Sequence, residues 1–282
     1  MGLSVSFQYL YVGQCQHLEC LCARGGRKEK IDFPALCGLI HHPDVGWILF
    51  DTGYSNHFFE ETQNYPERLY RTSLPVQLPE QQYLIIQLAQ KGIKPEEIKL
   101  IIVSHYHGDH ISGLKDFPNA RFIASKIDSE KIQRYIHRRW RATSQGKLPG
   151  LLPDNYFNRL TFVEEYPVCA LPKWMAPFLE GIDILGDGSL LLVYLPGHSK
   201  GQLGLLMPDA NGRPVFLVSD ACWSLPACLE GRLPSRLTYF FIENINAYKN
   251  TFNKVQMLGC REKEIVLLPS HCKQSWSAFL NE

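Results

Sequence analysis

The stretch that most constrains this chain is residues 105–110, His-Tyr-His-Gly-Asp-His, which holds three of its ten histidines and an aspartate. The apolar, β-branched run 98–103 directly before it predicts a buried strand. Side chains at alternate positions of an extended segment point to the same side, and the last histidine starts a segment that can turn into a helix. Imidazole nitrogens and carboxylate oxygens are ligands that zinc, iron and manganese accept. The stretch therefore predicts a metal site whose ligands include His105, His107, Asp109 and His110.

Three later strand-like runs each lead to a further candidate ligand. The run 190–195 is followed by His198, the run 215–219 by Asp220, and the run 265–268 by His271. Chemistry in α/β sheets collects beyond the ends of strands, where loops from several strands meet. We therefore expect these three side chains to join the ligands of the first stretch.

Seven candidate ligands exceed the four positions of one tetrahedral metal. They suit two metals about 3.5–4 Å apart, as in hydrolytic two-metal sites. A carboxylate has two oxygens to share, so Asp220 is the natural bridge. Water bridging two such metals becomes hydroxide near neutral pH, and the metals polarise a substrate carbonyl or phosphoryl group. The predicted catalytic carboxylates are Asp109 and Asp220.

Composition narrows the expected location and partners. Lys+Arg 29 against Asp+Glu 28 gives a net charge of +1, so no global field attracts nucleic acid or a membrane surface. No apolar run approaches the roughly 18 residues that span a bilayer, and the N-terminus lacks the pattern of a signal peptide. Nine cysteines without a Cys-x-x-Cys pair indicate reduced thiols. We therefore expect a cytoplasmic protein that binds neither nucleic acid nor membrane.

The organisation of the chain favours one domain of the α/β class, spanning residues 1–282, because no linker composition or internal repeat divides it. The segment 41–46 predicts a hairpin turn that exposes His41 and His42. The segment 128–141 predicts a basic helix. That helix and the Pro- and aromatic-rich stretch after it predict a lid-like insertion around 126–181.

In their order and spacing, the candidate ligands resemble the signature of the metallo-β-lactamase fold superfamily, His-x-His-x-Asp-His followed by a distant His, Asp and His. The resemblance covers nearly the whole chain and implies a four-layer αβ/βα sandwich. It implies one metal on His105, His107 and His198, a second on Asp109, His110 and His271, and a bridge through Asp220. It also implies that Asp51, in a strand-end Asp-x-Gly, orients a ligand imidazole.

Within the superfamily, length and layout are most similar to the N-acyl-homoserine lactone lactonases, which implies quorum-quenching lactone hydrolysis. Supporting stretches are 92–98, 117–120 and 196–198. Many of these lactonases carry a tyrosine three positions after the bridging aspartate, with its hydroxyl near the substrate carbonyl. This chain has Trp223 there, and an indole donates one hydrogen bond but cannot accept one. Tyrosines that could stand in for that hydroxyl are Tyr106, Tyr194 and Tyr239.

The apolar and aromatic side chains of the lid favour a small-molecule substrate with an apolar acyl group. The expected pocket residues are Tyr106, Trp174, Met175 and Trp223. The expected cofactors are two divalent metal ions, zinc first, with iron and manganese open. The sequence also leaves a homodimer open.

Other functions stay open from the sequence alone. The substrate could be another ester-like compound, namely an acyl thioester, a phosphodiester or a sulfate ester. The basic segment 126–141 and Lys200 would suit an anionic group on such a substrate. A metal-binding regulatory protein with little turnover is the alternative from a different class, and an intact set of seven ligands argues against it.

Overall fold

The computed structural model describes residues 5–262 and 264–280, and these residues form two compact units. The N-terminal unit comprises residues 7–16 and 32–162, and the C-terminal unit comprises 5–6, 17–31 and the described part of 163–282. Residues 1–4, part of the N-terminus in which we predict no signal peptide, lie outside the described residues. None of the described helices is long and apolar enough to cross a membrane.

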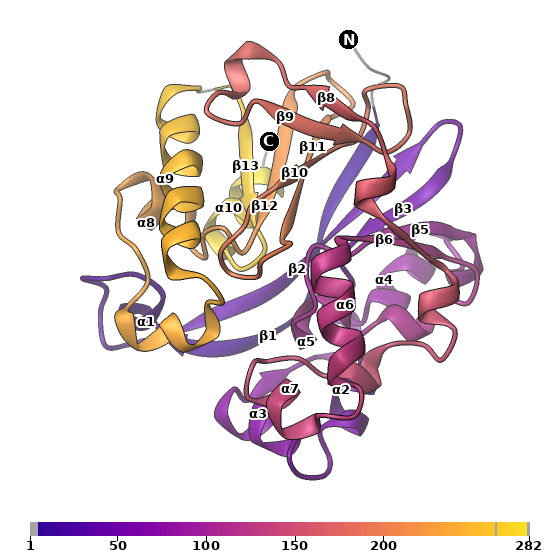
Figure 1. Ribbon diagram of the computed structural model, residues 1–282, viewed down its shortest axis with the longest axis vertical. Coiled ribbons are helices and arrows are strands. Elements are labelled where there is room, and N and C mark those ends of the chain that lie inside the picture. Colours follow the sequence, from indigo (N-terminus) through magenta and orange to yellow (C-terminus); the bar gives the residue numbers. More distant parts are fainter. Residues whose placement is uncertain (1–4, 263, 281–282) are drawn as a thin grey trace. The chain divides into compact units, whose positions relative to one another are not determined.

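Within the described residues, the N-terminal unit contains a seven-stranded sheet in the order β4-β1-β2-β3-β5-β6-β7. Figure 1 labels five of these strands, β1, β2, β3, β5 and β6. Its strands are β1 (Ser6–Leu18), β2 (Lys30–His42), β3 (Gly46–Phe50), β4 (Val76–Gln77), β5 (Ile98–Ile102), β6 (Arg121–Ala124) and β7 (Leu160–Phe162). Its helices are α2 (Asn56–Glu61), α3 (Arg68–Ser73), α4 (Leu84–Gln90), α5 (Gly108–Ile111), α6 (Lys126–Tyr135) and α7 (Arg139–Thr143).

The apolar runs of the N-terminal unit form its core strands, as the sequence predicts. The strand β3 pairs in parallel with β5, and β5 pairs in parallel with β6. The carboxyl ends of these strands therefore share one edge of the sheet. Asp51 follows β3 at this edge, and the loop 103–107 follows β5 there.

The hairpin predicted at 41–46 forms, but the exposure predicted for one of its histidines is wrong. The strands β2 and β3 pair antiparallel, with His42 opposite Gly46. His42 is 1% exposed, and its Nδ1 lies 3.2 Å from the backbone nitrogen of Asp44 and 3.3 Å from that of Val45. The imidazole thus holds the turn together. His41 is half-buried, and its ring centroid lies 4.6 Å from that of Trp47.

The basic helix predicted over 128–141 is two helices, α6 and α7. Arg138, at φ −129° and ψ 51°, lies outside the helical region and separates them. The Ile132 side chain of α6 is fully buried, whereas Trp140 of α7 is 67% exposed. No Gly or Pro marks this break, so composition alone could not reveal it.

The C-terminal unit contains, in the part of the chain that the structure describes, a six-stranded sheet in the order β13-β12-β11-β10-β9-β8. Its strands are β8 (Val168–Ala170), β9 (Glu180–Asp183), β10 (Leu191–Tyr194), β11 (Leu203–Pro208), β12 (Pro214–Ser219) and β13 (Val266–Pro269). Its helices are α1 (Glu19–Cys22), α8 (Leu225–Leu229), α9 (Ile245–Arg261) and α10 (Lys273–Leu280).

Strand direction places three candidate ligands at one edge of this second sheet. The strand β11 is antiparallel to both β10 and β12, and β12 is parallel to β13. The strands β10, β12 and β13 therefore run in the same direction and end at the same edge. The residues that follow them there are His198, Asp220 and His271.

The helix α9 covers this sheet with an apolar face and fixes the loop that carries His198. Its buried residues recur at helical spacing and join one core cluster with β10 and β12 (Tyr248, Phe252, Val255 and Leu258). Gly197 has φ 140°, and a Cβ there would lie 2.2 Å from the backbone of Tyr248. Only glycine fits this close approach of loop and helix.

The single domain predicted over 1–282, with a lid-like insertion around 126–181, stays a prediction. The first part of that insertion, with α6, α7 and β7, belongs to the N-terminal unit. The remainder, with β8 and the start of β9, belongs to the C-terminal unit.

Candidate functional site

Four candidate ligands of the N-terminal unit lie in the short segment between β5 and the end of α5. His105 Nε2 lies 3.1 Å from His107 Nδ1, and the ring centroids of His105 and His110 are 4.1 Å apart. Asp109 Oδ1 lies 3.9 Å from His110 Nε2. The three imidazoles are buried, and the Asp109 side chain is 13% exposed. The sequence prediction that these side chains converge agrees with this geometry.

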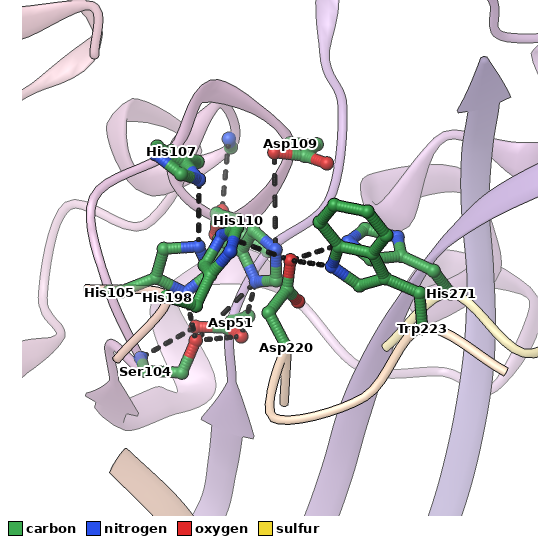
Figure 2. Close-up of polar contacts among 12 residues, drawn as sticks. Asp51, Ser104, His105, His107, Asp109, His110, His198, Asp220, Trp223 and His271 are labelled. Carbon is green, nitrogen blue, oxygen red and sulfur yellow. Dashed lines mark hydrogen bonds and ion pairs between the residues drawn. The ribbon is translucent and has the colours of Figure 1, made fainter. Parts of the chain in front are cut away.

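Asp51 contacts Ser104 and His110, next to these candidate ligands, as Figure 2 shows. Its Oδ1 accepts the Ser104 backbone N–H at 2.8 Å, and its Oδ2 accepts the Ser104 hydroxyl at 2.7 Å. The same Oδ2 lies 2.8 Å from His110 Nδ1. Since a carboxylate only accepts hydrogen bonds, Nδ1 of His110 carries the proton and Nε2 is the ring nitrogen that can bind a metal.

Ser104 is a residue of this site that the sequence analysis missed. Its hydroxyl donates to Asp51, and its oxygen lies 3.0 Å from His105 Nδ1. This arrangement lets Nδ1–H of His105 donate to the serine oxygen and turns Nε2 toward His107. Ser104 therefore links the buried carboxylate of Asp51 to the imidazole of His105. Its position directly before the first histidine was the one available signal.

The C-terminal unit supplies a second group of candidate ligands around Asp220. Asp220 Oδ2 lies 3.1 Å from His271 Nε2 and 3.2 Å from His198 Nε2. All three side chains are at most 4% exposed. Each follows a different strand, so the shared sheet edge brings together residues that are far apart in the sequence.

Trp223 adds its indole to this second group. Its Nε1–H donates to Asp220 Oδ2 at 3.2 Å (Figure 2). Its ring lies edge-on to the His198 ring, with 6.0 Å between centroids. Trp223 is buried, with 8% exposed. In this structure the indole N–H is therefore engaged by the carboxylate that the sequence assigns as the bridge.

Tyr106 and Met175, two of the four residues that we predict for the pocket, are core residues in the structure. Tyr106 is fully buried, and its hydroxyl lies 2.7 Å from Ser129 Oγ and 2.8 Å from Tyr156 Oη. Burial raises the pKa of this phenol. Met175 is fully buried in the core of the C-terminal unit, whereas its neighbour Trp174 is half-buried.

The cysteines next to the candidate ligands are buried. Cys222 and Cys272 are at most 4% exposed. The hydrogen bond with Cys228, together with burial, raises the pKa of the Cys222 thiol well above its ordinary value. This environment favours the neutral thiol, whereas metal ligation needs the thiolate. Lys200, the other neighbour singled out by sequence, is exposed.

Buried imidazoles and carboxylates at these distances fit a divalent metal ion. In the N-terminal unit, His105 Nε2 lies 3.1 Å from His107 Nδ1, and in the C-terminal unit the nitrogens of His271 and His198 lie 3.1 and 3.2 Å from Asp220 Oδ2. Such distances are typical of ligand atoms that bind the same metal ion. In the N-terminal unit, Asp51 and Ser104 also set the tautomers of His110 and His105, as ligand histidines require. The donor set of nitrogen and carboxylate oxygen suits zinc, iron or manganese.

Comparison with known protein families shows to which superfamily the chain belongs. A family model described as the Metallo-beta-lactamase superfamily matches residues 31–211, more than half of the chain. The chain belongs to the metallo-β-lactamase superfamily. The family that the ligand signature resembles, and the α/β sandwich fold that this resemblance implies, are therefore confirmed.

Similar superfamily proteins include lactonases. N-acyl homoserine lactonase AttM of Rhizobium radiobacter is 25% identical over 281 residues, which cover 96% of this chain and 95% of the relative. A solved N-acyl homoserine lactone hydrolase with N-hexanoyl-L-homoserine bound at its catalytic metal center has a TM-score of 0.70 at 18% identity, covering 98% of this chain and 97% of that one. AidC, a dizinc quorum-quenching lactonase in complex with a product, has a TM-score of 0.64 at 17% identity, covering 97% and 90%. The family and these relatives support hydrolase activity.

Proposed function

We propose that this protein is a dimetal hydrolase that opens the ring of an N-acyl-homoserine lactone. The observation that carries the proposal is the pair of buried ligand groups, each at the edge where same-direction strands of its sheet end. The relative AttM, similar over nearly its whole length, is a lactonase by name. The superfamily match supports the metal chemistry, and the relative supports the choice of lactone.

We assign the metal ligands as the family signature implies. One metal would be held by His105, His107 and His198, and the other by Asp109, His110 and His271, with Asp220 shared by both. When bound, two such metals lower the pKa of a water molecule toward neutrality and polarise the substrate carbonyl. Asp109 and Asp220 are then the catalytic carboxylates.

The residues behind the ligands orient them for this chemistry. Asp51 keeps the proton of His110 on Nδ1, so that Nε2 is presented as the ligand. Ser104 does the same for His105. The indole of Trp223 donates to the ligand oxygen of Asp220, which reduces the basicity of that oxygen and restricts its rotation. Preorganisation of this kind lowers the reorganisation needed during the reaction.

The identity of the metal and the acyl group of the substrate also belong to this proposal. Zinc is the proposed metal, because a structural neighbour is named as dizinc, and iron or manganese would fit the same ligands. The proposed substrate carries an apolar acyl group, as do the homoserine products in the neighbouring structures. A cytoplasmic location and a homodimer stay predictions.

A second candidate, hydrolysis of an acyl thioester or another ester-like substrate, is favoured by Trp223. This residue stands where many lactonases have a tyrosine, and its only donor faces Asp220 at 3.2 Å. The exposed cations of α6 and α7 would also suit a phosphate-bearing substrate. The two candidates share metals and ligands and differ only in the group that is hydrolysed.

Steady-state rates decide between these candidates. The metal-replete wild type and Trp223→Tyr would be assayed with acyl-homoserine lactones of several chain lengths, an acyl thioester and a phosphodiester. The proposal expects lactone opening by the wild type, with a rate that rises with acyl length. Efficient thioester hydrolysis without lactone opening, even by Trp223→Tyr, would reject the lactone substrate and support the second candidate.

A further inference from the structure

Tyr70 of α3 reaches the candidate ligands of the N-terminal unit, although neither the motif nor the family signature includes it. Its hydroxyl lies 3.5 Å from Asp109 Oδ1. Its ring packs edge-on against the buried Phe58, with 5.3 Å between centroids. The residue is 8% exposed. A polar group is thus held against a candidate metal ligand by an apolar partner.

The contacted oxygen shows on which side of Asp109 the hydroxyl lies. Oδ1 is also the oxygen that lies 3.9 Å from His110 Nε2, the nitrogen that Asp51 presents as a ligand. Tyr70 therefore contacts the Asp109 oxygen that faces the ligand nitrogen of His110. A contact of 3.5 Å is longer than an ordinary O–H···O bond, as is common for catalytic groups before substrate is bound.

The loop after α7 passes close to both the Tyr70 ring and His107 of the histidine motif. Gly146 has φ 66°, and its carbonyl accepts the Gly108 N–H at 3.3 Å. A Cβ at Gly146 would lie 3.2 Å from His107 Cδ2 and 3.6 Å from Tyr70 Cε2. Tyr70 and His107 thus flank the same glycine, whose left-handed backbone conformation disfavours residues with a side chain.

An ion pair fixes the helix that carries Tyr70. Glu67, the residue before α3, is 2% exposed and accepts two hydrogen bonds from Arg139 of α7, Nε to Oε1 at 2.8 Å and Nη2 to Oε2 at 2.6 Å. This bidentate geometry restrains both partners more than a single contact would. This ion pair therefore ties the start of α3, the helix that carries Tyr70, to α7.

The tyrosines singled out from sequence have their hydroxyls engaged elsewhere. Tyr106 contacts Ser129 and Tyr156, Tyr194 donates to Glu164, and Tyr239 contacts Arg24. The hydroxyl of Tyr70, by contrast, is directed at a candidate ligand. A neutral phenol is a good donor to an oxygen on which negative charge develops.

We propose that Tyr70 is a catalytic residue whose hydroxyl donates a hydrogen bond to the ester group of the substrate, at the oxygen that gains negative charge. This inference rests on the proposed ester-type hydrolysis. Its step is a hydrogen bond only, with no covalent change at the tyrosine. It also accounts for a tryptophan at position 223, because the donor comes from α3 instead.

Tyr70→Phe tests the role directly, since it removes the hydroxyl and keeps the ring packed on Phe58. We expect kcat for the lactone to fall about 100-fold, as for loss of one oxyanion donor, with metal content unchanged. We also expect the affinity for the ring-opened acyl-homoserine, measured by calorimetry, to fall about tenfold, because a bond to its carboxylate is lost. Tyr70→His, which keeps a donor, should recover part of kcat.

The matched control is Tyr83→Phe, which removes a hydroxyl that contacts Asn56 at 2.6 Å on the surface and should leave both quantities unchanged. Wild-type kcat and product affinity in Tyr70→Phe would overturn the inference while the hydrolase function stands. Loss of metal from Tyr70→Phe, with kcat restored by excess metal, would also overturn it, because Tyr70 would then only position Asp109. A wild type that hydrolyses no ester would instead reject the proposed function and the inference with it.

Discussion

Replacing Asp51 with asparagine tests how the site depends on a residue that does not itself bind metal. Asparagine matches aspartate in shape and tolerates the left-handed backbone conformation found here, φ 61°. The change therefore removes the carboxylate and disturbs the backbone little. Alanine is a poorer probe, because it would add a conformational cost of about 1–2 kcal/mol at this φ.

The hydrogen bonds of Asp51 set the expected magnitude. The carboxylate accepts two donors from Ser104 and one from His110, on two oxygens. An amide has one accepting oxygen, so in either orientation at least one of these buried donors faces an NH₂ group. A buried hydrogen bond to a charged group contributes about 1.5–3 kcal/mol. Since about 1.4 kcal/mol corresponds to a factor of ten, Asp51→Asn should slow turnover by about 10- to 100-fold.

Steady-state kinetics and metal analysis of the same preparation would check this prediction. At saturating metal, Asp51→Asn should keep its metals, because the ligands themselves remain, and should show the loss in kcat. Ser104→Ala is the matched comparison. It removes the hydroxyl but keeps the backbone N–H on Oδ1, so its loss should be smaller. Wild-type kcat and metal affinity in a folded Asp51→Asn protein would refute the argued role of the carboxylate.

Three further outcomes follow from the structure. Asp220→Ala should abolish activity and lower metal content from about two equivalents, since the shared oxygen is gone; wild-type content by mass spectrometry would contradict the bridge. Gly197→Ala should lower the free energy of unfolding by more than about 2 kcal/mol in thermal melts, because its Cβ would meet the Tyr248 backbone at 2.2 Å; an unchanged melting temperature would refute this. Burial raises the pKa of the Cys22 thiol to about 12, so at pH 8 it should be alkylated far more slowly than the exposed Cys260, with a rate that rises toward pH 12; equal rates at pH 8 would contradict this environment.

The sequence predicted the parts of the site that depend on strands and their ends. Apolar runs gave the strands β5, β10, β12 and β13, and a His or Asp follows each of them. Within the C-terminal sheet, β10, β12 and β13 run in the same direction and bring their residues to one edge, so an apolar run followed by a His or Asp was a sufficient signal there. The alternation that groups His105 with His107 also directs Tyr106 to the opposite side, which is why it lies in the core and not in a pocket.

The sequence could not predict contacts between residues that are far apart in the chain and lie in loops or short helices. Ser104 meets Asp51 across 53 residues, and Tyr70 meets Asp109 across 39 residues. Neither contact leaves a local pattern, because a serine or a tyrosine serves as well in a turn or a core. His42 shows a different limit, because its partners are the backbone N–H groups two and three residues later, and a turn sequence does not reveal whether the imidazole points into the turn or into solvent.

Backbone strain at two strand ends supports a functional reading of both ligand groups. Asp51 directly follows β3 with φ 61°, and Ser219 ends β12 with φ 48°, conformations that residues with side chains adopt at a cost. The pairing of β12 with β13 also shifts register between Leu217 and Ser219, directly before Asp220. An irregularity at that point re-aims the next side chain. Glycine would relieve the strain at either position, but it would remove the carboxylate at position 51 and loosen the backbone directly before Asp220 at position 219. The chain instead keeps a side chain at each position and tolerates the strain, as expected where the direction of a carboxylate matters more than local stability.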